Sequence, residues 1–191
     1  MPNVFKYELE IDVPDYVDLK LEGMTVTVKG KLGTITKDFS HMKNIEISYE
    51  NKKLKILSFF PKKKTIASMG TLKSLVVNAI EGVDKGYEYR MKIAYSHFPI
   101  TLETKGREIY IKNFLGERSP RITYKVSDDV EIKASKEDVI VKGIDKEEVS
   151  QTAANIQKRC RIRRKDSRSF MDGIYVWQKL LGDKVIWTLK Y

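Results

Sequence analysis

The chain has 191 residues, enough for one large domain or two small ones, and its 41% hydrophobic content is typical of a globular protein. Thirty-six Lys and Arg residues against 26 Asp and Glu residues give a formal net charge of +10, which favours an anionic partner such as nucleic acid. The single cysteine, Cys160, excludes a scaffold held together by internal disulfides. Acidic residues near the N-terminus argue against a signal peptide, and no apolar run approaches the roughly 20 residues that cross a bilayer, so we expect a soluble intracellular protein.

In chain order, the first clear strand pattern has a second copy 83 residues later. Val26–Gly33 reads Val-Thr-Val-Lys-Gly-Lys-Leu-Gly, and Ile109–Gly116 reads Ile-Tyr-Ile-Lys-Asn-Phe-Leu-Gly. Both segments alternate β-branched residues with other residues and then run into a turn. Glycine and asparagine accept a positive φ most readily, so we expect Gly30 and Asn113 to occupy the same turn position.

Each copy is followed by short strand patterns and then by a helical pattern. Apolar residues recur at three- and four-residue steps through Ile66–Ile80, and more thinly through Val149–Cys160. The sequence therefore predicts an α+β fold of two tandem similar modules, each a small, mainly antiparallel sheet packed on one α-helix. We expect an N-terminal module over residues 1–86 and a C-terminal module over 87–191, which opens with the alternating segment Tyr87–Tyr95. The expected strands after each copy are 44–49, 53–58, 130–134 and 139–142.

Two short segments are dense in basic residues and hold much of the net positive charge. Residues 157–168 hold seven basic residues against one acid, and Lys62, Lys63 and Lys64 directly precede the first predicted helix. The arginine fork pairs with phosphate through two hydrogen bonds, and a phosphate at a helix N-terminus would also bind free backbone N–H groups. Cations near a helix C-terminus also stabilise the helix itself, which is the alternative explanation for the first residues of the distal run.

The sequence gives little support for catalysis or for a bound cofactor. Its two histidines, His41 and His97, have no partners at a spacing that would build a metal site. No phosphate-binding glycine loop and no G-x-S-x-G motif occurs. We therefore expect a protein that is not an enzyme and has no cofactor, metal or small-molecule substrate. The apolar tail, residues 176–187, is expected to dock on the C-terminal module or on a neighbouring protein.

A further set of motifs runs through almost the whole chain. The most specific is Arg168–Val176, which reads Arg-Ser-Phe-Met-Asp-Gly-Ile-Tyr-Val and follows a Gln-x-x-Cys-Arg-Ile-Arg run. The chain is similar in these segments to the large-subunit ribosomal protein six family, in its eukaryotic/archaeal branch, the ninth large-subunit protein in the older eukaryotic numbering. The other matching segments are Ile11–Pro14, Lys73–Leu75, Gly82–Tyr87, Tyr95–Pro99, Asn113–Gly116 and Val149–Gln151.

The resemblance implies a duplicated α+β protein that is a structural constituent of the large subunit of the cytosolic ribosome. It also implies binding of ribosomal RNA, chiefly through the C-terminal module, near the sarcin–ricin loop and the translation-factor site, with neighbouring ribosomal proteins as further partners. The alternative is an RNA-binding protein acting outside the ribosome or in its assembly. Carried over to this sequence, the RNA contacts fall on Arg163, Arg164, Lys165, Arg168 and Lys179, supported by Tyr175, and the charge pattern adds Lys62, Lys63 and Lys64.

Overall fold

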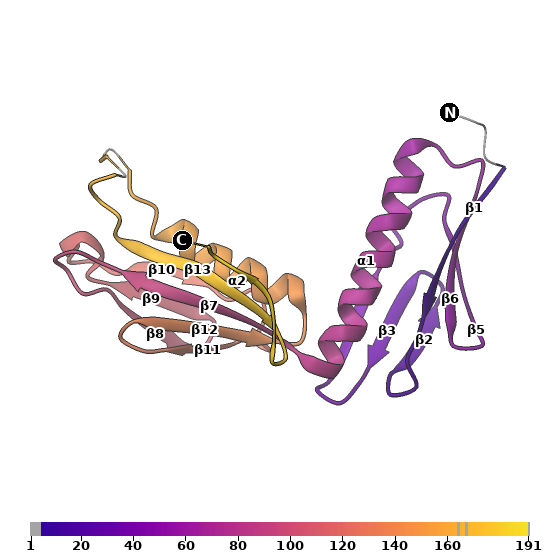
Figure 1. The fold of residues 1–191 in the computed structure, drawn as a ribbon, viewed down its shortest axis with the longest axis horizontal. Helices are drawn as coiled ribbons and strands as arrows, with labels where there is room; N and C mark the ends of the chain where they lie inside the picture. Colours follow the sequence, from indigo (N-terminus) through magenta and orange to yellow (C-terminus); the bar gives the residue numbers. More distant parts are fainter. Residues whose placement is uncertain (1–4, 164, 167, 191) are drawn as a thin grey trace. The chain divides into compact units, whose positions relative to one another are not determined.

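The computed structural model describes residues 5–163, 165–166 and 168–190. The chain divides into two compact units, Met1–Lys85 and Gly86–Tyr191. Each unit contains one long helix and two antiparallel sheets (Figure 1), so the predicted α+β class is confirmed. We expected one sheet in each module, and each unit has two.

The N-terminal unit has two three-stranded sheets and the helix α1 (Lys63–Lys85), which contacts strands of both sheets. The first sheet has the strand order β1 (Lys6–Asp12), β6 (Lys53–Phe59) and β5 (Glu46–Glu50). The second has the order β2 (Asp18–Glu22), β3 (Thr25–Lys29) and β4 (Thr34–Asp38).

The C-terminal unit has a five-stranded sheet, a three-stranded sheet and the helix α2 (Lys146–Arg159). The larger sheet has the order β11 (Glu131–Ala134), β12 (Asp138–Gly143), β7 (Tyr87–Ala94), β13 (Gly173–Leu181) and β14 (Lys184–Thr188). The smaller sheet has the order β10 (Arg121–Tyr124), β9 (Glu108–Lys112) and β8 (Thr101–Lys105), and a short 3-10 turn (Phe114–Gly116) follows β9.

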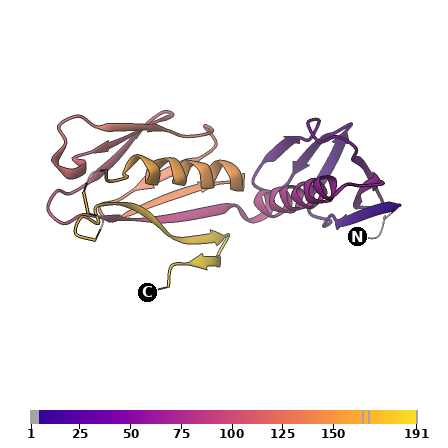
Figure 2. The same ribbon diagram turned by 90° about the horizontal axis from the view of Figure 1, so that it is seen from above.

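The two units repeat one topology. The order β1-β6-β5 corresponds to β7-β12-β11, and β2-β3-β4 corresponds to β8-β9-β10. The repeated sequence pattern falls on β3 and β9, which are the central strands of the two matching sheets. In the C-terminal unit alone, β13 and β14 are added to the free edge of β7 (Figure 2), so this unit is the common fold plus a hairpin.

The elements form where the sequence pattern matches their geometry. Val26 and Val28 alternate with polar residues in β3 and are both 1% exposed, as expected for a strand with one face in the core. Helix α2 is capped at its N-terminus by Asp145, whose side chain accepts a hydrogen bond from the backbone N–H of Glu147 at 2.9 Å. Its buried residues Val149 and Ile156 lie on one face and pack into the core.

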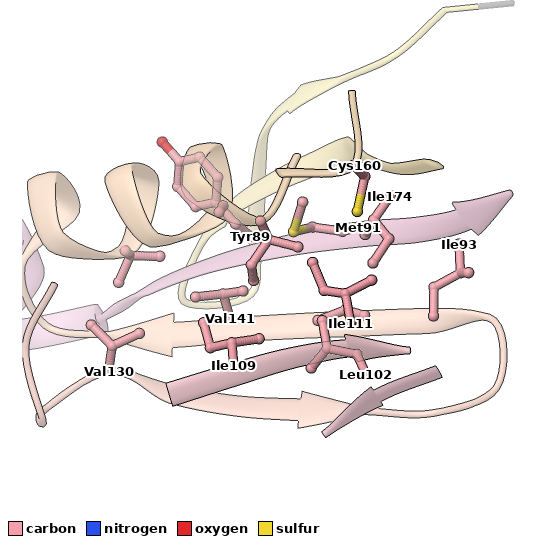
Figure 3. Close-up of a cluster of buried hydrophobic side chains, with 14 of the residues drawn as sticks. Tyr89, Met91, Ile93, Leu102, Ile109, Ile111, Val130, Val141, Cys160 and Ile174 are labelled. Atoms are coloured by element: carbon pink, nitrogen blue, oxygen red, sulfur yellow. The ribbon is translucent and has the colours of Figure 1, made fainter. Parts of the chain in front are cut away.

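The core of the C-terminal unit gathers side chains from both sheets and from the end of α2. Figure 3 shows Tyr89 and Met91 of β7 beside Ile111 of β9, Ile174 of β13 and the thiol of Cys160. Burial raises the pKa of the Cys160 thiol to about 12, because the thiolate would lose its hydration. The cysteine is therefore a small apolar core residue with no reactive thiolate at neutral pH.

The expectation that Gly30 and Asn113 share one turn conformation is wrong. Asn113 has a φ of 58°, whereas Gly30 is not among the residues with positive φ. A Cβ atom on Gly30 would lie 2.6 Å from Cγ2 and 2.9 Å from the carbonyl oxygen of Val83 in α1. Glycine is required at position 30 by the close approach of the helix, a tertiary contact that the repeat alone does not reveal.

Candidate nucleic-acid interface

The basic segment, residues 161–168, starts directly after α2, where the helix ends against the core. Lys158 and Arg159 occupy the last turn of the helix, and Cys160 follows with a φ of −83° and a ψ of 10°. Because Cys160 is 2% exposed, its burial fixes the point at which the chain leaves the helix and turns outward. The basic side chains that follow are therefore presented from an anchored position.

Arg121 of β10 supplies a second anchor for this segment. Its Nη1 donates a hydrogen bond to the carbonyl oxygen of Arg159 at 3.0 Å and a longer one to that of Arg161 at 3.4 Å. Nε and Nη2 donate to the two carboxylate oxygens of Glu117 at 2.8 and 2.6 Å, and the guanidinium lies 4.1 Å from the ring centroid of Phe114. Arg121 holds the pKa of Glu117 below its usual value through these hydrogen bonds, and Glu117 in turn raises the pKa of Arg121. Our sequence reasoning did not identify Arg121.

The predicted residues of the basic segment differ in whether their side chains pair with a carboxylate. Arg163 is exposed, and no carboxylate in the described part of the chain pairs with it. Lys165 is exposed and places Nζ 4.4 Å from the ring centroid of Phe170. Arg168 instead pairs with Asp166, with Nη2 3.0 Å from Oδ2, and this contact lowers the pKa of Asp166. Arg164 lies outside the described residues.

Tyr175 and Lys179, the other two predicted positions, lie on β13. The hydroxyl of Tyr175 donates to the carbonyl oxygen of Asp172 at 3.3 Å. A Cβ atom on Gly173 would lie 2.7 Å from Cζ of this ring, so glycine is needed there for the ring to take its position. The ammonium group of Lys179 lies 5.3 Å from the ring centroid of Tyr89 and 5.1 Å from that of Trp187.

A groove of about 1230 Å³ brings part of the predicted set together. It is lined by the outer residues of α2, by the basic segment, by β13 and by β14, and includes Lys165, Tyr175 and Lys179. Three cations that we had not assigned to the RNA contact, Lys92, Lys158 and Arg161, also line it. Arg163 and Arg168 are not lining residues. The groove depends on the hairpin that the C-terminal unit adds to the common fold, because residues of β13 and β14 line it. We name it the hairpin groove.

The lining of the hairpin groove combines cations and rings without acids. Among the described residues that line it there is no Asp or Glu. Lys92 is a lining cation that forms ion pairs, to Asp138 at 3.0 Å and to Glu137 at 3.8 Å. The aromatic lining residues are Tyr89, Phe170, Tyr175, Trp177 and Trp187. Cations suit phosphates and open rings suit base faces, so the arrangement has the chemistry of an RNA-binding surface.

The apolar tail, residues 176–187, was expected to dock on the C-terminal module or on a neighbouring protein, and in the structure it forms much of the β13–β14 hairpin. β13 pairs antiparallel with β7 from Gly173–Ala94 to Leu181–Tyr87, so the first part of the tail docks on the C-terminal unit. The register shifts between Val176 and Gln178, which leaves Trp177 as a bulge opposite β7. β14 is exposed along its length.

Lys62, Lys63 and Lys64 belong to the other unit. All three are exposed at the start of α1, whose first turn contains no acidic residue. The structure thus assigns the two predicted basic sets to separate units. No group of His, Cys, Asp and Glu suited to a metal ion occurs among the residues described, and His97 is exposed in the loop after β7. None of the helices described is long and apolar enough to cross a membrane.

Comparisons with known proteins agree with this architecture. The sequence model of the family described as "Ribosomal protein L6" matches the chain twice, over residues 13–86 and 98–173. A protein of Staphylothermus marinus, named "Large ribosomal subunit protein uL6", is 45% identical over 179 residues, covering 93% of this chain and 95% of the relative. Proteins with the same name from Desulfurococcus amylolyticus and Methanothrix thermoacetophila are 41% and 42% identical, covering 94% and 88% of this chain and 98% and 95% of the relatives.

Proposed function

The chain belongs to the ribosomal protein L6 family, in its archaeal type, and on this premise we propose that it is a structural component of the large ribosomal subunit that binds ribosomal RNA. The family is structural rather than catalytic, in agreement with the expectation that this protein is not an enzyme. The observation that carries the RNA contact is the acid-free lining of the hairpin groove beside the exposed side chains of Arg163, Lys165 and Arg168.

The finer proposal concerns where the RNA is held. The contacts are assigned to Arg163, Lys165, Arg168 and Lys179 with Tyr175, and to Arg164, which lies outside the described residues. By the resemblance, the RNA lies near the sarcin–ricin loop and the translation-factor site of the cytosolic ribosome, next to other ribosomal proteins. Among these residues Lys165, Tyr175 and Lys179 share one groove, which supports a single continuous contact on the C-terminal unit.

Binding is electrostatic in this proposal. Each lysine or arginine that neutralises a phosphate releases condensed counterions, so affinity falls as salt rises. The Arg168–Asp166 pair does not prevent Arg168 from taking part, because it is an exposed ion pair, and such pairs are worth little in water. If about six phosphates are neutralised, affinity for the bare RNA, outside the assembled subunit, drops roughly a thousandfold between about 50 and 200 mM salt. A slope of affinity against salt near zero would exclude this mechanism.

The direct test is the assembly of a charge-reversed protein. Arg163→Glu combined with Lys165→Glu is expected to reduce incorporation into large subunits severalfold or more, with no loss of folding by circular dichroism. Lys133→Glu combined with Lys136→Glu is the matched control, because Lys133 in β11 and Lys136 in the segment between β11 and β12 are both exposed, and the change in charge is the same. Equal incorporation of the two double variants would contradict the proposal.

A high-salt wash distinguishes the ribosomal function from the alternative. A structural component stays with the large subunit after the wash, whereas an assembly factor or another RNA-binding protein is released. Recovery of the protein only in the free fraction would favour the alternative.

A further inference from the structure

We propose that the hairpin groove binds an unpaired nucleotide of RNA, with a base against its open rings and the flanking phosphates against its lysines and arginine. The inference rests on the proposed function and names the kind of RNA element that the same surface takes. The groove has about 1230 Å³ of space, more than the roughly 300–1000 Å³ of a typical small-ligand pocket, so a nucleotide and part of its neighbours fit.

The first argument is the exposure of the rings. Phe170 is 39% exposed, Tyr175 is 42% exposed and Trp187 is 42% exposed, although all three line a concave surface. Rings left open in a groove offer flat faces on which bases of any type can stack. Met171, at 64% exposure, adds apolar surface at the same place.

The second argument is that the ammonium groups of Lys165 and Lys179 lie beside aromatic rings and not beside carboxylates. Lys165 lies over the ring of Phe170, and Lys179 is near the rings of both Tyr89 and Trp187. No carboxylate of the described chain lies within ion-pair distance of either ammonium group, so binding a phosphate breaks no salt bridge. Each ammonium group therefore sits beside a stacking surface with donors available, which matches the alternation of base and phosphate along a single strand.

The third argument is Trp177. This residue is the bulge of β13, and its carbonyl oxygen accepts a hydrogen bond from the backbone N–H of Leu189 at 2.8 Å, which ties the two arms of the hairpin together. Its Nε1 is buried and has no acceptor among the described atoms. A buried donor without an acceptor is costly, and Trp177 lines the groove, so in this proposal a small adjustment of the hairpin on binding lets an oxygen of a base or ribose satisfy it.

These features favour an unpaired nucleotide over a duplex. In an RNA duplex the base faces are stacked on one another, so a protein reaches phosphates and 2′-hydroxyls and the rings gain no partner. Lysines alone would suit either form. The rings gain a stacking partner from RNA only when a base is out of the stack.

The test uses the full chain and two dye-labelled RNAs, a single strand of about ten uridines and a duplex of about ten base pairs, with affinities measured by fluorescence anisotropy at one salt concentration. Trp187→Ala is expected to weaken single-strand binding about tenfold or more and duplex binding less than twofold. Tyr124→Ala is the control, since Tyr124 is an exposed ring of β10 outside the groove, at 56% exposure against 42% for Trp187. Trp187→Phe keeps a ring and is expected to restore most of the affinity.

A second readout does not depend on affinity. The chain has two tryptophans, Trp177 and Trp187, and both line the groove, so ring contact can be followed in the unmodified protein. Its tryptophan fluorescence is expected to be quenched by the single strand and not by the duplex. Equal effects of Trp187→Ala on both RNAs, or no quenching by the single strand, would overturn the inference. So would a response of this fluorescence to an acidic apolar peptide but not to RNA, which would assign the groove to a protein partner. Duplex binding that persists in those cases leaves the proposed function intact, whereas no binding of either RNA counts against both.

Discussion

Arg121 and Arg159, which are 38 residues apart, are joined by a hydrogen bond of 3.0 Å from the guanidinium of the first to the backbone carbonyl of the second. This contact ties β10 to the last turn of α2, and a longer one reaches the first residue of the basic segment. The carbonyls at a helix C-terminus have no partners within the helix. A guanidinium donates hydrogen bonds to them, and its positive charge also interacts favourably with the negative end of the helix dipole. Arg121 thus links the stability of α2 to the position of the RNA-binding cations.

Replacing Arg121 by methionine is expected to cost about 2 kcal/mol in the free energy of unfolding, because hydrogen bonds from a charged group contribute roughly 1.5–3 kcal/mol and the side chain is only 24% exposed. RNA affinity is expected to fall as well, since the basic segment loses an anchor. Chemical denaturation and RNA titration measure the two effects. Arg107→Met is the control, because Arg107 is 57% exposed and bonds the carbonyl of Val126 instead. If both variants lose equal stability, Arg121 is not an anchor.

The pair of Glu117 and Arg121 gives a specific pH dependence. Arg121 lowers the pKa of Glu117 below its usual 4.5, so the ionised carboxylate stabilises the fold above about pH 4.5 and this contribution is lost as the pH falls through the lowered value. The side chain of Glu117 is 41% exposed, and screening by solvent limits the contribution to on the order of 1 kcal/mol. Glu117→Gln is therefore expected to be less stable than the parent at pH 7, with the difference shrinking toward pH 3. A difference that is constant with pH would contradict this assignment.

Two glycines of the N-terminal unit are expected to respond to alanine in opposite directions. Gly30→Ala places a Cβ atom 2.6 Å from Val83 and is expected to destabilise the fold by about 1–3 kcal/mol. Gly70→Ala, inside α1, meets nothing within 4 Å and is expected to stabilise it by about 0.5–1 kcal/mol, because alanine is the better helix former. Thermal unfolding of the two variants checks both signs. Stabilisation by Gly30→Ala would show that the helix does not approach this turn closely.

The structure shows what the local sequence could and could not predict. The β3 and β9 strands and both helices follow from alternation and helical spacing, because their patterns are local. The role of Arg121 does not follow from any local pattern. Two of its acceptors are backbone carbonyls 38 and 40 residues away, and a backbone carbonyl has no sequence signature. The i,i+4 spacing of Glu117 and Arg121 was the available signal. The hairpin groove could not be predicted either, because β13 pairs with β7, whose partner residues lie 79 (Gly173 and Ala94) to 94 (Leu181 and Tyr87) positions earlier in the chain.

The RNA contact of the three lysines at the start of α1 remains a prediction. Changing Lys62, Lys63 and Lys64 to glutamate removes positive charge where the helix N-terminus disfavours it, so the melting temperature is not expected to fall. If these lysines bind RNA, the slope of log affinity against log salt falls by about one for each phosphate that the variant no longer neutralises. Salt titration of the triple variant against the parent provides the comparison. An unchanged slope would identify the lysines as a solvated face of the helix.

Lysine footprinting inside intact large subunits tests the central claim most directly, namely that RNA lies against the basic segment and the hairpin groove. Acetylation is measured residue by residue in the free protein and in the subunit, together with crosslinks to RNA. Lys165 and Lys179 are expected to lose reactivity on assembly and to crosslink to RNA, while the exposed Lys133 and Lys136 serve as the reference. Full reactivity of Lys165 and Lys179 in the subunit, with RNA crosslinks confined to other surfaces, would contradict the account.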